Sequence, residues 1–231
     1  FEALCEFLAE ICKVYEVILV SSGAIAVART IVDIKKDSIT NRQALAAIGQ
    51  PYLMEIYENL MKNHSINVAQ ILLTASDFDS RKKTLFAKNV IEKLCEYKIL
   101  PIINENDTIG IEEILFGDND RLSSSVTHYF GADLLVILSD IDGYYTADPR
   151  VDPKARIRSL VNHITEEELS QKPLPGSLVG SGGIVTKLKA ANFLLERGSS
   201  MFLASGFDLS VARDFLLKGK QTGGTLFKAE L

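Results

Sequence analysis

The chain contains the run LLVILSDIDGY at residues 134–144, in which five apolar residues are followed at once by a polar turn. An apolar run of this length that ends in an Asp-Gly turn predicts a strand buried on both faces. Strands without polar alternation are typical of a parallel sheet that helices cover on both sides. Further strands are predicted at residues 17–20, 68–73, 99–103, 201–203 and 225–227.

Helical patterns separate these strands. Apolar residues recur at helical spacing from Leu4 to Cys12, and Thr165 with Glu168 forms a capping box for a brief helix. Longer helices are predicted at about 41–63, from Asp79 or Ser80 to about Tyr97, after Asn119, at 186–197 and at 208–218. Pro51 should break or kink the first of them. A short hairpin is expected at 108–116. The alternation predicts an α/β fold, an αβα sandwich with a mainly parallel central sheet in one domain.

Composition narrows the class of protein. The net charge is −5 and the basic residues are dispersed, so no nucleic-acid footprint is present. The longest apolar runs are too short to span a bilayer, and residues 1–11 carry no basic leader. Cys5, Cys12 and Cys95 show no CxxC spacing, which favours buried thiols in a reducing compartment. No histidine pair has metal-ligand spacing, so no metal ligand is assigned. We therefore expect a cytoplasmic protein without a nucleic-acid or membrane partner.

Polar clusters follow the predicted strands at four places. They lie at Ser21–Gly23, Asn104–Asp107, Ser139–Asp140 and Ala204–Gly206. In parallel sheets the carboxyl ends of strands share an edge, and ligands bind there. This coincidence predicts a ligand site built from these clusters.

A glycine-rich segment, GSGGIVTK at residues 180–187, opens a predicted helix and ends in Lys187. It is not a Walker A loop, because the lysine follows threonine rather than glycine. Backbone N–H groups at a helix N-terminus attract anions, so the segment favours a phosphate site. The alternative interpretation is a flexible surface turn with a solvated lysine.

Two acidic segments point to a second ligand. They read NEND at 104–107 and GDND at 117–120. Carboxylate and amide side chains at this density suit a small substrate with an ammonium group, although Asp118 and Asp120 could simply cap the following helix. For Ser139–Tyr144, the alternative to a ligand site is likewise an ordinary Asp-Gly turn. Taken with the glycine-rich segment, the two acidic segments indicate phosphoryl transfer onto a small acid.

These residues resemble the amino acid kinase superfamily from about Val17 to Phe227. The matching runs are SGAIA at 22–26, AIGQP at 47–51, IINEND at 102–107, FGDND at 116–120 and GGIVTK at 182–187. The second, third and fourth of these runs together are particular to the members that act on glutamate. The resemblance therefore implies the fold of that superfamily and glutamate as the phosphate acceptor.

The same resemblance implies roles for individual residues. Asp107 would pair with the α-ammonium of glutamate, and Ser22 and Asn119 would hydrogen-bond the substrate. Lys187 would neutralise charge on the transferred phosphoryl group, and Asp120 would orient lysines at the phosphate. The nucleotide-binding positions are matched by Ser139, Asp140, Ser181, Gly182, Gly183, Ile184, Val185, Thr186 and Lys187.

The implied reaction converts ATP and L-glutamate into ADP and γ-glutamyl phosphate, the first step of proline synthesis, with Mg²⁺ bridging the phosphates. Because the γ-carboxylate is already a nucleophile, positioning and charge stabilisation would carry the catalysis without a general base. The resemblance also implies proline as a feedback inhibitor and a homo-oligomer, a dimer or a tetramer.

Two departures from the family pattern matter. Family members begin with a strand carrying Lys-x-Gly-Ser, whereas this chain opens at the following helix, so we expect that the natural protein has a preceding segment. Many bacterial relatives add a C-terminal RNA-modification-type domain, and we expect residues 1–231 to be the kinase domain alone. Two other functions stay open: a kinase for acetylglutamate, aspartate, carbamate or UMP, and a non-catalytic sensor of nucleotide or amino acid.

Overall fold

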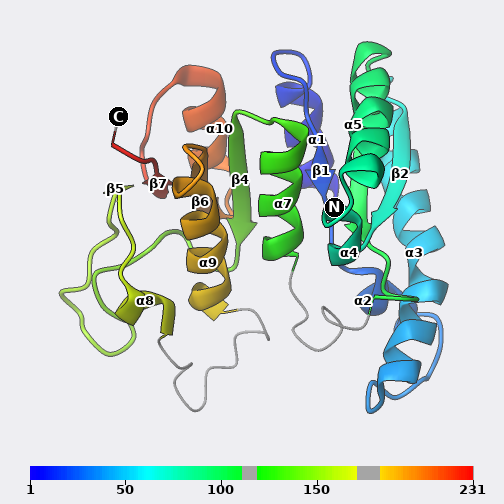
Figure 1. The fold of residues 1–231 in the computed structure, drawn as a ribbon, viewed down its shortest axis with the longest axis horizontal. Coiled ribbons are helices and arrows are strands. Elements are labelled where there is room, and N and C mark those ends of the chain that lie inside the picture. Colours follow the sequence, from blue (N-terminus) through cyan, green and yellow to red (C-terminus); the bar gives the residue numbers. More distant parts are fainter. Residues whose placement is uncertain (111–118, 171–182, 231) are drawn as a thin grey trace. The chain divides into compact units, whose positions relative to one another are not determined.

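The computed structural model describes residues 1–110, 119–170 and 183–230. Contacts divide the chain into two compact units, Phe1–Leu122 and Ser123–Leu231, which are described separately. Most of the sheet ladders in both units are parallel, and helices alternate with strands along the chain, as the sequence pattern predicts (Figure 1). Within the described ranges, no helix is long and apolar enough to cross a membrane.

The first unit is built on a three-stranded sheet with the order β1-β3-β2. Both ladders are parallel, and all six residues of the central strand β3 are buried. Its elements are α1 (Glu2–Ile11), β1 (Leu19–Val20), α2 (Ala24–Ala28), α3 (Ile39–Lys62), β2 (Val68–Leu73), α4 (Ala75–Phe78), α5 (Arg81–Glu96) and β3 (Leu100–Glu105). The predicted strand 17–20 is therefore shorter than expected, while the strand at 68–73 has the predicted bounds.

Helix α3 corrects one expectation. The helix continues through Pro51 as a single element of 24 residues, so the predicted break is wrong. Proline removes one backbone hydrogen bond of the helix. The helix also buries Leu45, Leu53, Tyr57 and Met61, and packing of such a face commonly decides helical stability. That burial offsets the lost bond.

Local capping signals agree with the sequence. The Ser80 side chain accepts a hydrogen bond from the backbone N–H of Lys83 and so caps the N-terminus of α5. In the second unit, Thr165 and Glu168 form the predicted capping box, with the Thr165 N–H donating to Oε2 of Glu168 at 2.7 Å. Helices α2 and α4 and strand β5 are too short to produce a periodic pattern, and the sequence did not predict them. The expected hairpin at 108–116 falls mainly on 111–116, outside the described residues.

The second unit contains a four-stranded sheet with the order β4-β6-β7-β5. β6 runs parallel to β4 and antiparallel to β7, so this sheet is mixed. The unit's remaining elements are α7 (Asp120–Phe130, which begins in the first unit), β4 (Leu134–Ser139), β5 (Leu160–Val161), α8 (Glu166–Ser170), α9 (Gly183–Leu195), β6 (Ser200–Ser205), α10 (Ser210–Lys218) and β7 (Thr225–Phe227).

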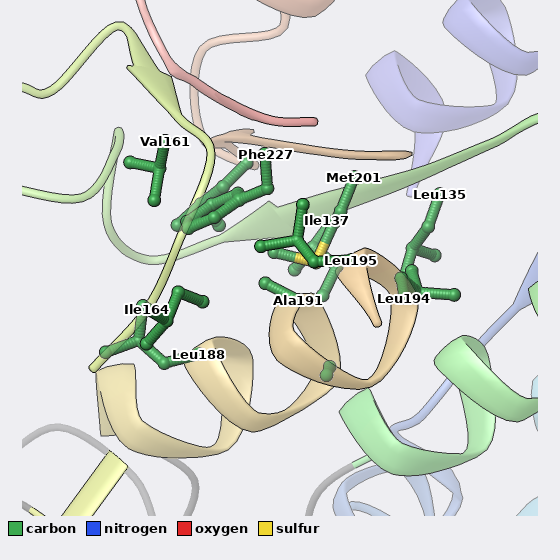
Figure 2. Close-up of a cluster of buried hydrophobic side chains, with 12 residues drawn as sticks. Leu135, Ile137, Val161, Ile164, Leu188, Ala191, Leu194, Leu195, Met201 and Phe227 are labelled. Carbon is green, nitrogen blue, oxygen red and sulfur yellow. The ribbon is translucent and has the colours of Figure 1, made fainter. Parts of the chain in front are cut away.

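Helices cover both faces of this second sheet. Met201 on β6 belongs to a core cluster with Leu188 and Leu194 of α9, and Figure 2 shows these side chains gathered between helix and sheet. The next residue, Phe202, points to the opposite face because side chains alternate along a strand. It stacks on Phe215 of α10 with ring centroids 3.9 Å apart. The helix–sheet–helix layering predicted for the fold is present in this unit.

Cysteine burial is less uniform than expected. Cys5 is buried in α1, but Cys12 and Cys95 are only partly buried, and all three are free thiols. Burial raises the pKa of each thiol above its ordinary value. The three side chains are therefore held mainly as neutral thiols at neutral pH.

Candidate active site

In the first unit, two of the predicted polar segments lie at one edge of the sheet. β1 and β3 are parallel with Val20 opposite Ile103, and the backbone N–H of Ser21 donates to the carbonyl oxygen of Ile103 at 2.9 Å. The chain leaves β1 at Ser21 and leaves β3 at Asn106. Ser22 and Asp107 thus follow the carboxyl ends of neighbouring parallel strands, the place where α/β sheets bind ligands.

The turn that carries Ser22 is held by two glycines and a tyrosine. Gly23 has φ +113°, which a residue with a β-carbon rarely adopts, and it is the N-cap of α2. Gly49 lies against the first residue of α2, with no room for a side chain. The hydroxyl oxygens of Ser21 and Tyr57 are 2.8 Å apart in a buried hydrogen bond. The turn is therefore fixed against α3, which explains structurally why the 22–26 and 47–51 runs occur together.

The segment that carries Asp107 forms a tight turn after β3. The backbone N–H of Gly110 donates to the carbonyl oxygen of Asn106 at 2.8 Å, and the Gln43 side chain donates to the carbonyl oxygen of Thr108 at 3.1 Å. Asp107 is half-buried. Burial raises the pKa of its carboxyl group above the ordinary value, because loss of hydration disfavours the charge. A cationic group bound here would reverse that effect.

Asn119 lies beside β3, although 14 residues separate it from Asn104 in the sequence. Its Nδ2 donates to Oδ1 of Asn104 at 2.9 Å. The next residue, Asp120, begins α7 and is 7% exposed. The structure thus brings Asn119 to the residues of the predicted 104–107 segment. Gly117 and Asp118 lie outside the described ranges.

In the second unit, Ser139 ends β4 and Asp140 follows it. The Ser139 hydroxyl donates to Oδ1 of Asp140 at 2.9 Å, and the backbone N–H of Gly206 donates to the Ser139 carbonyl oxygen at 2.6 Å. Ser139 lies opposite Ser205, the last residue of β6. The polar clusters after β4 and β6 are therefore joined at the carboxyl ends of two parallel strands.

Helix α9 begins at Gly183, inside the glycine-rich segment, three residues before the predicted start. Ile184, Val185, Thr186 and Lys187 form its first turn, and the Thr186 hydroxyl donates to the Gly183 carbonyl oxygen at 3.0 Å. Lys187 is half-buried. The expectation that this segment opens a helix is confirmed. Ser181 and Gly182 fall on residues that the structure does not describe.

One polar cluster of the second unit was only partly visible in the sequence. Oε1 of Glu168 accepts from the Tyr144 hydroxyl at 2.6 Å and from the Arg158 guanidinium at 2.7 Å. Burial acts to raise the pKa of Glu168, but the hydrogen bonds from Thr165, Tyr144 and Arg158 lower it to about 2. Burial and the bond to Glu168 raise the pKa of Tyr144 to about 12. The capping box predicted Thr165 as a partner, but no local pattern connects residues 144, 158 and 168.

Metal ligands do not gather in the described part of the chain. Within those residues, no group of three or more histidine, cysteine, aspartate or glutamate side chains is placed to hold a metal ion. Mg²⁺ commonly binds through one or two carboxylates together with substrate phosphates and water rather than through a full protein cage.

Comparison with known proteins supports the chemistry that these segments suggest. The model of the amino acid kinase family matches residues 1–205, which run through both units. The glutamate 5-kinase of Leishmania donovani is 54% identical over 98% of this chain and 86% of its own length. The glutamate 5-kinase of Wolinella succinogenes is 53% identical over 98% of this chain and 88% of its own length.

Solved structures with this fold are more distant in sequence. An isopentenyl phosphate kinase from T. acidophilum has a TM-score of 0.62 at 16% identity, covering 98% of this chain and 91% of its own. A UMP kinase from Bacillus anthracis has a TM-score of 0.59 at 14% identity, covering all of this chain and 86% of its own. At these identities the likeness supports the fold alone.

Proposed function

Because the chain belongs to the amino acid kinase family, we propose that it transfers the γ-phosphoryl group of ATP to the γ-carboxylate of L-glutamate. The observation that carries this proposal is the similarity to glutamate 5-kinases at more than half identity along nearly the whole chain. The product is γ-glutamyl phosphate, and the reaction is the first step of proline biosynthesis.

The first unit is proposed to hold glutamate through Ser22, Asp107 and Asn119. Two features support this assignment. Ser22 and Asp107 follow the ends of the neighbouring strands β1 and β3. Asn119 is hydrogen-bonded to Asn104, which lies in β3, the strand that precedes Asp107. The half-buried Asp107 carboxylate, with its raised pKa, gains most from a bound ammonium group, because a nearby cation stabilises its charged form.

The second unit is proposed to hold ATP through Ser139, Asp140 and the segment from Ser181 to Lys187. The start of α9 at Gly183 supports this, because the first turn of a helix presents backbone N–H groups and a positive dipole end to phosphate. Lys187 in that turn would neutralise charge on the transferred group, and Asp120 would orient the lysines that contact the phosphates.

In the reaction, one oxygen of the γ-carboxylate forms a bond to the γ-phosphorus of ATP. The bond from that phosphorus to the bridging oxygen breaks, and its electron pair leaves with ADP. The carboxylate needs no deprotonation, so the protein contributes positioning and charge stabilisation. Mg²⁺, when bound, would neutralise charge on the phosphates.

Further properties remain proposals. The match of one family model to both units supports a single kinase domain. A homo-oligomer, inhibition by proline and a cytoplasmic location are predictions that rest on the family resemblance and on cysteines without disulfide spacing.

The test is ADP production by the full-length protein with Mg-ATP and a panel of acceptors: glutamate, acetylglutamate, aspartate, carbamate and UMP. Hydroxylamine traps an acyl phosphate as a hydroxamate. We expect turnover with glutamate alone and a trapped γ-glutamyl hydroxamate. Turnover with another acceptor would overturn the substrate assignment, and folded protein that binds ATP without turnover would favour a sensor.

A further inference from the structure

A chain of four amide side chains crosses the first unit. Nδ2 of Asn119 donates to Oδ1 of Asn104 at 2.9 Å, and Nδ2 of Asn104 donates to Oε1 of Gln50 at 2.9 Å. Nε2 of Gln50 then donates to Oε1 of Gln70 at 3.0 Å. These hydrogen bonds join α3, β2 and β3 to Asn119. Asn104 and Gln50, its two inner members, are 4% and 8% exposed, so water cannot easily replace their bonds.

One backbone group sets the donor-to-acceptor direction of these amide hydrogen bonds. The N–H of Glu105 donates to Oδ1 of Asn104 at 2.8 Å. A backbone N–H only donates, so the atom of Asn104 that faces it must be the oxygen. The nitrogen of Asn104 then faces Gln50, which must present its own oxygen. Amide orientation is normally ambiguous between the two atoms, but this contact resolves it for Asn104 and Gln50.

The same contact determines the orientation of Asn119. Because Oδ1 of Asn104 is an acceptor, Asn119 must approach it with Nδ2. The two ends of an amide group point apart, so Oδ1 of Asn119 faces away from Asn104. A group that meets this end of Asn119 meets an acceptor.

We propose that Gln50 and Asn104 are positioning residues that hold Asn119 with its amide oxygen toward the substrate ammonium. This inference rests on the proposed function. An ammonium group has three donors and no acceptor, so it matches the Asn119 oxygen together with the Asp107 carboxylate. A substrate that presents only an acceptor at the same place would face two acceptors and be disfavoured. The amide chain thereby contributes selectivity for a free amino group.

The experiment compares Gln50→Met with Gln50→Glu in the full-length protein. Methionine has a similar unbranched shape but no strong acceptor for Asn104. In Gln50→Glu, one carboxylate oxygen still accepts from Asn104, and the exposed Gln70 amide can rotate to donate to the other. Two quantities are measured for each protein: the KM for glutamate, and the inhibition constant of glutarate, which has both carboxylates and no ammonium.

In Gln50→Met, the buried Nδ2 of Asn104 loses its acceptor, so we expect the Asn104 amide to shift and Asn119 to shift with it. The glutamate KM should then rise about fivefold to tenfold, the loss typical of one hydrogen bond between uncharged groups. The inhibition constant of glutarate should change by less than about twofold, because glutarate has no donor for Asn119 to accept. Gln50→Glu should keep both wild-type values. A parallel rise of both quantities, or equal effects of the two substitutions, would overturn the inference and leave Gln50 with a purely structural role.

Two controls keep the outcome interpretable. Absence of glutamate turnover in the wild-type protein would contradict the proposed function itself and is measured first. If Gln50→Met does not fold, hydrogen exchange of the side-chain amide groups is followed by NMR in the wild-type protein. We expect the amides of Gln50 and Asn104 to exchange far more slowly than that of Gln70, and equal exchange at all three would refute the amide chain.

Discussion

A β-carbon added to Gly49 would lie 1.8 Å from the carbonyl oxygen of Ala24, so α3 and the first residue of α2 meet backbone against backbone. This contact fixes the place where the chain turns after β1. Ser22, which we propose as a glutamate ligand, lies two residues before Ala24 in that turn. A glycine on one helix therefore controls the position of a substrate contact on another segment.

Replacing Gly49 with alanine tests this contact. In an ordinary helix the change from glycine to alanine stabilises by about 1 kcal/mol. Here we expect overpacking to destabilise the protein by about 2 kcal/mol instead, and the displaced turn should raise the KM for glutamate. Urea unfolding and steady-state kinetics measure the two effects. The matched control is Ala47→Gly at an exposed position of the same helix, which should cost about 1 kcal/mol without changing the KM.

Asp107→Asn should separate stability from binding. Burial raises the pKa of Asp107 in the folded protein, so the folded state holds this proton more tightly than the unfolded state. The stability that Asp107 contributes is then present below its unfolded pKa of about 3.9 and is lost as pH rises through the folded pKa. At neutral pH, Asp107→Asn should therefore raise the melting temperature of the ligand-free protein.

The same substitution should raise the glutamate KM about tenfold to a hundredfold, because a charged hydrogen bond to the ammonium is lost. Thermal unfolding from about pH 4 to pH 8 and kinetics at pH 7 measure both effects. Exposed Asp133 supplies the control Asp133→Asn, which should change neither. A comparable loss of ATP binding in Asp107→Asn would contradict the assignment of this residue to glutamate.

Lys187→Ala should reduce turnover much more than substrate affinity. If Lys187 stabilises charge that develops on the transferred phosphoryl group, kcat should fall about 10²- to 10³-fold, as for loss of other transition-state contacts. The glutamate KM should change little. Lys189, on the exposed side of the same helix, provides the control Lys189→Ala, which should retain activity. A mutant that loses glutamate affinity while keeping kcat would refute the role.

Glu168→Gln should destabilise the protein in a pH-dependent manner. The folded pKa of Glu168 is lowered to about 2, so its contribution is fully present above the unfolded pKa of about 4.3 and is lost as pH falls toward the folded value. We expect a cost of about 2 kcal/mol at pH 7.

Denaturant unfolding at several pH values measures this cost, and the difference from wild type should shrink below about pH 4. The neighbouring exposed Glu167 offers the control Glu167→Gln, which should be nearly neutral. A difference that is independent of pH would mean that packing, and not the ionised carboxylate, stabilises this cluster.

Much of the fold and part of the candidate site were predictable from local patterns. The strand at residues 68–73, the Ser80 and Thr165 caps and the helix opened by the glycine-rich segment each depend on neighbouring residues. The sequence-based predictions of helices and strands failed where contacts with distant residues decide the local structure. The continuity of α3 through Pro51 depends on a buried face of the helix, and the short elements α2, α4 and β5 depend on what they pack against.

The sequence by itself determined the α/β class, the order of the long elements and the polar clusters that follow the strands, because hydrophobic periodicity and capping act over a few residues. Only the tertiary structure decided which of those polar residues meet. Asn119 reaches Asn104, and Asn104 reaches Gln50, across 15 and 54 residues of chain. Such contacts form only when strands and helices pack, and their direction depends on one backbone N–H that no sequence pattern marks.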